Sequence, residues 1–199
     1  MPSPKAMSKS RLEAFSDGVI AILITIMVLE LKIPHGAALT DLKPMLPIFL
    51  TYVLSFVMLG IYWNNHHHLV HATDHINGRV LWANMHLLFW LSLIPFVTGW
   101  MGENHVEPLP TATYGAVLLM AGVAYYLLVR MLLALTGNTR LAHAIGQDWK
   151  GALSVVLYVV AIPLAFVNPW IAIGIYVLVA VTWFCPDPRI ESRADPSRD

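Results

Sequence analysis

The sequence predicts an all-α integral membrane protein with six transmembrane helices in each subunit. Of its 199 residues, 57% are hydrophobic and only 12% are charged, whereas a soluble domain carries about twice that share of charge. Apolar segments also recur along the chain between short polar breaks. Composition therefore excludes a soluble globular domain, and the segments give the number of spans.

The spans are predicted at about 15–33, 46–69, 80–101, 112–134, 151–167 and 169–185. As a helix, the first is roughly 28 Å long, which matches a hydrocarbon core of about 30 Å. The last two are short and are joined at Asn168-Pro169, a tight hairpin. We expect one domain over residues 1–199, in which 186–199 form a charged cytoplasmic tail.

Basic residues predict the orientation of these spans. With the N-terminus inside, ten lysines and arginines lie on the cytoplasmic side, and only Lys32 and Lys43 lie outside. Cytoplasmic loops are enriched in both residue types, so both termini are expected in the cytoplasm. The ten are Lys5, Lys9, Arg11, Arg79, Arg130, Arg140, Lys150, Arg189, Arg193 and Arg198.

Several classes of function are disfavoured by the same sequence. A formal net charge of zero argues against nucleic acid as a partner. A single cysteine, Cys185, excludes an internal disulfide and a cysteine-based zinc site. The protease and esterase patterns H-E-x-x-H and G-x-S-x-G are absent, and no carboxylate pair lies within the spans, so we expect no enzyme.

The first span carries one polar side chain between Asp17 and Glu30, the hydroxyl of Thr25. It lies on a stripe of residues at steps of four and three, which share one face of a helix. One hydroxyl on an apolar stripe suits the lining of a narrow pore. Two other interpretations are open: a hydroxyl bonded back to the carbonyl of Ala21, or a buried packing seam. The stripe comprises Arg11, Phe15, Gly18, Ile22, Thr25 and Leu29.

The start of this span reads Arg11-x-x-x-Phe15-Ser16-Asp17-Gly18. This run closely resembles the signature of the transmembrane protein 175 family, potassium channels of bacteria, archaea and lysosomes. The resemblance covers essentially the whole chain, and the length matches the prokaryotic single-repeat members. Further agreement comes from Trp63-Asn64-Asn65-His66, from Asn84 and from Pro95-Phe96.

The resemblance implies a homotetramer in the bacterial cytoplasmic membrane, whose first helices line a pore for potassium ions without a cofactor. It implies an apolar constriction, a threonine and a second apolar residue in that pore, here Ile22, Thr25 and Leu29. It also implies that signature residues hold the pore helix against its neighbours; these are Arg11, Phe15, Ser16, Asp17 and Gly18.

Physical reasoning agrees with a pore lined by side chains. No T-V-G-Y-G segment is present, which excludes a filter of backbone carbonyls. Four copies of Ile22 would form an apolar ring that blocks ions by dewetting. Four copies of Thr25 would supply hydroxyls that replace part of a cation's hydration shell. Our hypothesis is that Ile22 gates and Thr25 selects.

The two charges of the signature need partners. Arg11 and Asp17 are six residues apart, about 240° around a helix, so they cannot pair with each other. Each is expected to meet another span or subunit, with His66 and Asn84 as candidates. Alternatively, Asp17 caps the start of the helix.

Histidines crowd the end of the second span, together with Asp74. His67, His71 and His75 share a face at i, i+4 spacing, an arrangement that is able to hold zinc or another transition metal. Such a cluster supports a transition-metal transporter, or a membrane protein regulated by metal or pH, as an alternative function. The simpler interpretation is a polar cap at the membrane interface, since ligands at mid-membrane are missing.

Overall fold

The structure, a computed structural model, describes residues 9–73, 75–135 and 149–184. The tail 186–199, Cys185 and Asp74 lie outside these ranges, as do Lys5, Arg140, Arg189, Arg193 and Arg198. The described elements are α1 (Lys9–Ile26), η1 (Met27–Glu30), η2 (Leu39–Met45), α2 (Leu46–His71), α3 (Gly78–Ser92), α4 (Ile94–Glu103), α5 (Pro108–Leu133), α7 (Trp149–Leu164) and α8 (Pro169–Phe184).

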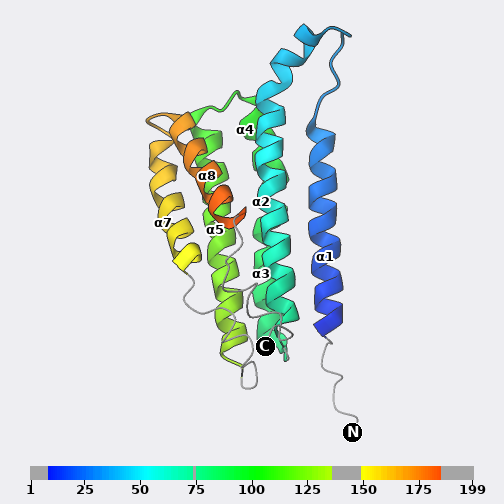
Figure 1. Cartoon of the computed structure of the whole chain (residues 1–199), viewed down its shortest axis with the longest axis vertical. Coiled ribbons are helices and arrows are strands. Elements are labelled where there is room, and N and C mark those ends of the chain that lie inside the picture. Colours follow the sequence, from blue (N-terminus) through cyan, green and yellow to red (C-terminus); the bar gives the residue numbers. More distant parts are fainter. Residues whose placement is uncertain (1–8, 74, 136–148, 185–199) are drawn as a thin grey trace, which may run out of the picture.

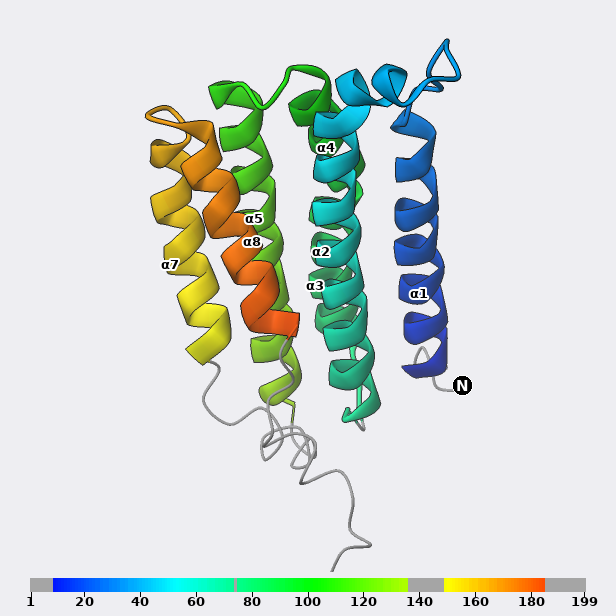
Figure 2. The same cartoon turned by 45° about the horizontal axis from the view of Figure 1, so that its top comes forward.

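The helices run side by side, with α1 at one edge of the bundle and α7 and α8 at the opposite edge (Figures 1 and 2). Helix α1 contacts α2, α3 and α4. Helix α5 packs mainly against α3 on one side and α7 on the other. The position of α1 leaves one side of this helix without a neighbour among the described elements.

Four segments are long and apolar enough to cross a membrane: Lys9–Glu30, Leu39–His71, Gly78–Glu103 and Pro108–Leu133. Helices α7 and α8 are apolar but have only 16 residues each. At 1.5 Å per residue they reach about 24 Å, less than a hydrocarbon core of about 30 Å. All six predicted segments are helical, and length and composition support four of them as full spans.

The third predicted span consists of two helices, α3 and α4, which meet at Leu93. Pro95 has no N–H to donate to the carbonyl one turn earlier, so the regular hydrogen-bond pattern is interrupted. The N–H of Leu93 instead donates to the carbonyl of Trp90, at 3.2 Å, in a tighter turn. At the other end, the side chain of Asn77 caps α3 by accepting from two backbone N–H groups at 3.0 Å.

Hydroxyl groups join the helices inside the bundle. The Oγ of Ser55 on α2 lies 2.7 Å from the Oγ1 of Thr98 on α4 and 3.0 Å from the hydroxyl of Tyr114 on α5. All three side chains are buried. Because their polar atoms have partners, they can lie in an apolar interior without a large desolvation penalty.

Gly115 on α5 makes room for the buried ring of Tyr176, whose hydroxyl donates to the carbonyl of Thr111 at 3.1 Å. A Cβ at position 115 would contact that hydroxyl and lie 2.8 Å from the ring Cζ. We expect Gly115→Ala to lower the free energy of unfolding by about 1–3 kcal/mol, measured by thermal denaturation in detergent. Gly174→Ala is the control, because a Cβ there meets nothing within 4 Å. Equal melting of the two variants would contradict tight packing at Gly115.

Candidate functional site

Helix α1 and the η1 turn have two different faces. One face is buried against the neighbouring helices and consists of Leu12, Ser16, Ile20, Leu23 and Met27. The other face carries the predicted stripe, and every residue of this stripe is exposed. The exposed fraction is 59% for Ile22 and 78% for Leu29. A packing seam within the chain is therefore the wrong interpretation of the stripe.

Thr25 is exposed, and its hydroxyl donates to the carbonyl of Ile22 at 2.9 Å. The expected bond back to the helix is present, one residue away from the Ala21 carbonyl that we considered. It uses the proton of the hydroxyl and leaves lone pairs of the oxygen available as acceptors. Gly18 lies on the same face, and a Cβ placed there would meet no atom within 4 Å. The packing of this chain therefore does not require glycine at position 18.

An ion pair connects the loop that follows η1 to the end of α4. The ammonium of Lys32 lies 2.6 Å from a carboxylate oxygen of Glu103, at the end of α4. This hydrogen-bonded carboxylate raises the pKa of the Lys32 ammonium. Both side chains are exposed, so the pair orients the loop after η1 more than it stabilises the fold.

Three signature and partner residues form a buried polar chain across three helices. Ser16 on α1 donates to the carbonyl of Leu12 at 2.9 Å and accepts from the Nδ2 of Asn84 on α3, also at 2.9 Å. The Oδ1 of Asn84 lies 2.8 Å from the Nε2 of His66 on α2. Since Oδ1 can only accept, His66 donates from Nε2, and its Nδ1 has no hydrogen-bond partner in the described part of the chain.

The partner of Asp17 differs from our expectation. Its Oδ1 accepts from the indole N–H of Trp63 at 3.0 Å, whereas Asn84 bonds to Ser16 and to His66. One residue corresponds to about 100° of helix, so Asp17 meets α2 while the neighbouring Ser16 meets Asn84 on α3. The capping interpretation is also wrong, because α1 begins at Lys9, two turns earlier.

The remaining signature residues, Arg11 and Phe15, are exposed. No ion pair between described residues involves Arg11. Within this chain, the structure thus brings together Ser16, His66 and Asn84, and separately Asp17 and Trp63.

We expect Asn84→Ala to lower the free energy of unfolding by about 1–3 kcal/mol, because it leaves a buried histidine and a buried serine without their shared partner. Thermal denaturation in detergent measures this. Asn64→Ala is the matched control, since Asn64 is exposed on α2. If the two variants melt at the same temperature, the polar chain does not stabilise the packing of α1.

The predicted histidine face is only partly formed. Helix α2 ends at His71, so the i, i+4 face does not continue to His75, and that expectation is wrong. The rings of His67 and His71 stack with centroids 6.0 Å apart. The Nδ1 of His67 also lies 3.3 Å from a carboxylate oxygen of Glu13 on α1. This contact was not predictable from sequence patterns, because it joins two helices.

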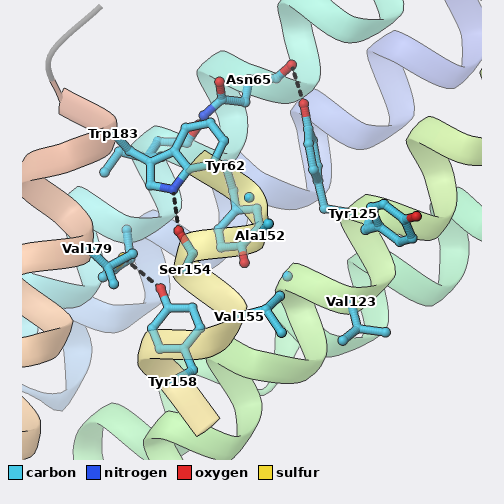
Figure 3. Close-up of a pocket in the computed structure, with 15 residues that line it drawn as sticks. Tyr62, Asn65, Val123, Tyr125, Ala152, Ser154, Val155, Tyr158, Val179 and Trp183 are labelled. Atoms are coloured by element: carbon cyan, nitrogen blue, oxygen red, sulfur yellow. Dashed lines mark hydrogen bonds between the residues drawn. The ribbon is translucent and has the colours of Figure 1, made fainter. Parts of the chain in front are cut away.

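A cavity of about 420 Å³ lies between α2, α5, α7 and α8 (Figure 3). Polar atoms on its wall are largely paired: the N–H of Trp183 donates to Ser154 at 2.8 Å, and the hydroxyl of Tyr125 donates to the carbonyl of Asn65 at 3.3 Å. The described lining contains no acidic, basic, histidine or cysteine side chain. It therefore offers no charged ligand for a cation, and α1 contributes nothing to it.

Comparisons with known proteins agree with these features. The family model for the endosomal/lysosomal potassium channel TMEM175 matches residues 11–95. A protein of Chryseobacterium sp. named as a potassium channel is 53% identical over 186 residues, which cover 93% of this chain and 97% of that relative. A potassium channel of Chamaesiphon minutus is 29% identical and is covered over 95% of its length.

The fold is similar to a solved structure. The crystal structure of a lysosomal potassium-selective channel TMEM175 homolog from Chamaesiphon minutus superposes with a TM-score of 0.78 at 26% identity. The match covers 88% of this chain and 96% of that chain. The likeness therefore extends beyond the 11–95 segment to the later helices.

Proposed function

Because this chain belongs to the TMEM175 family, we propose that it is a potassium-permeable channel that conducts passively through a central pore. The pore is formed by a homotetramer in the bacterial cytoplasmic membrane, with both chain termini in the cytoplasm. Relatives named as potassium channels support potassium as the permeant ion. No cofactor is needed, because conduction transfers no group and moves no electron.

The observation that carries this proposal is the exposed face of α1. This helix lies at the edge of the bundle (Figure 1). Its inner face buries large side chains such as Ile20 and Leu23, and its outer face carries the stripe. A helix that only faced lipid would gain nothing from the hydroxyl of Thr25. It would also gain nothing from a glycine at position 18, where a Cβ would meet no atom within 4 Å. Four such faces around one axis would enclose a pore lined by side chains.

Each position on this face has a proposed role. Four Ile22 side chains form the narrow apolar ring that gates the pore, because an apolar ring excludes water when it is narrow. Four Thr25 oxygens, whose protons are donated to the Ile22 carbonyls, present lone pairs to a cation one turn further on. Leu29 continues the apolar lining.

Flux through liposomes tests the proposal. The purified protein is reconstituted into vesicles loaded with potassium, and efflux is compared with vesicles loaded with sodium and with protein-free vesicles. We expect passive potassium efflux that exceeds sodium efflux and does not saturate at low concentration. Absence of flux above the protein-free vesicles, or saturable movement of zinc in its place, would contradict a potassium channel.

A further inference from the structure

Three side chains of types that commonly bind metal ions meet where α1 passes the end of α2. They are Glu13 and Asp17, one turn apart on α1, and His67 on α2. One ligand atom from each lies within 4.8 Å of the others, and all three residues are partly buried. The groups are thus close enough to share one ion.

The charges of this cluster are incompletely balanced within the described chain. Carboxylates at i, i+4 on a helix repel each other. Among the described residues, the only ion pair that involves either of them is Glu13 with His67, at 3.3 Å. The ammonium of Lys9 donates to the backbone carbonyl of His71 at 2.7 Å, and no ion pair between described residues joins it to either carboxylate. A cation between the two carboxylates would offset their repulsion.

Neighbouring aromatic groups hold these ligands in place. The indole N–H of Trp63 donates to one oxygen of Asp17 and leaves its other oxygen for a ligand. The ring of His67 is stacked between Trp63 and His71, with both pairs of centroids 6.0 Å apart. Metal sites use such surrounding contacts to fix the orientation of carboxylates and imidazoles.

We propose that Glu13, Asp17 and His67 bind a divalent transition-metal ion, with Zn²⁺ as its simplest representative, and so link α1 to α2. Zinc accepts imidazole nitrogen and carboxylate oxygen in a tetrahedral site, and three protein ligands leave one position for water. In such a site the ligand atoms lie about 3.3 Å apart. Small side-chain rotations would bring the three ligand atoms, now within 4.8 Å of one another, to that spacing. Magnesium and calcium prefer oxygen ligands alone, and the imidazole therefore favours a transition metal.

This site is independent of the proposed pore. It rests on contacts between α1 and α2 within one chain, whereas the pore face is the exposed stripe on α1. It also differs from the run of His67, His71 and His75, because only His67 belongs to both sets. Its ligands include no residue of the stripe, so metal binding and ion flux are measured separately.

Isothermal titration calorimetry tests the proposal on the whole chain. The protein is purified in detergent, and bound metal is removed with a chelator before the titration. We titrate zinc chloride into the wild type and into Glu13→Gln, His67→Gln and His35→Gln. We expect one zinc ion per chain in the wild type, with Kd raised about tenfold or more by the first two substitutions. His35→Gln is the matched control, because His35 is an exposed histidine in the loop after η1, and its Kd is expected to stay within about twofold. Glu13→Gln is nearly isosteric, so it separates lost coordination from misfolding.

Three results would overturn the proposal: no zinc binding by the wild type, unchanged binding by both ligand variants, or an equal loss in His35→Gln. A second readout guards against loss of the fold. Zinc is expected to raise the melting temperature of the wild type but not of Glu13→Gln, because a ligand that binds only the folded state stabilises it. Potassium flux without zinc reports separately on the channel, so failure of one claim is distinguishable from failure of the other.

Discussion

Replacing Ile22 by asparagine is expected to raise the potassium flux of the reconstituted protein by about tenfold, which corresponds to removing about 1.4 kcal/mol from the barrier. Ile22 is 59% exposed on the free face of α1, where four copies form the proposed apolar ring. An amide offers hydrogen bonds to water, so the ring stays hydrated and no longer excludes ions. Efflux of potassium from liposomes measures the change.

Ile22→Leu is the matched control for this experiment, because it keeps the apolar character and nearly the same volume. Its flux is expected to remain close to that of the wild type. The gating role of Ile22 would be contradicted by an asparagine variant that reconstitutes normally and conducts no faster than the leucine variant.

Replacing Thr25 by valine is expected to lower the ratio of potassium to sodium flux by about threefold or more, or about 0.7 kcal/mol in relative barrier height. Valine has nearly the same shape as threonine but lacks the oxygen that we propose faces the pore. The hydroxyl proton is already donated to the carbonyl of Ile22, so the substitution removes mainly an acceptor for the cation. Reversal potentials or paired flux assays measure the ratio.

Thr113→Val provides a matched control for this substitution. Thr113 is a partly buried threonine on α5 whose hydroxyl also donates back to its own helix, to the carbonyl of Leu109 at 2.9 Å. Its replacement is expected to leave the flux ratio unchanged, and Thr25→Ser is expected to preserve it. If Thr25→Val retains the selectivity of the wild type, the threonine is not a selectivity layer.

The sequence predicted those features that depend on helical periodicity and composition. The stripe through Ile22 and Thr25 was identified from steps of three and four residues, and the structure confirms that these residues share one exposed face of α1. Helices were also expected, and are present, in all six apolar segments. These features follow from local patterns, and no partner on another helix is needed to recognise them.

The contacts between helices were not predictable in the same way. Asp17 pairs with Trp63, 46 residues away, because of how α1 and α2 are rotated against each other. A sequence pattern gives the face of a helix but not the residue that it meets. The break at Leu93 was missed because apolar content continues past it. The extension of the histidine face to His75 was wrong because it relied on residue spacing alone, and α2 ends at His71.

The central claim is that the exposed face of α1 lines the pore, and cysteine accessibility tests it most directly. In a Cys185→Ser background, single cysteines replace Ile22 or Thr25 on the stripe, Leu23 on the buried face, or Phe89 on the exposed surface of α3. A positively charged, water-soluble thiol reagent is then added during potassium efflux. We predict that it inhibits flux through the Ile22 and Thr25 variants and leaves the Leu23 and Phe89 variants unaffected. Inhibition at Phe89 or Leu23, with none at Ile22 and Thr25, would contradict a pore lined by α1.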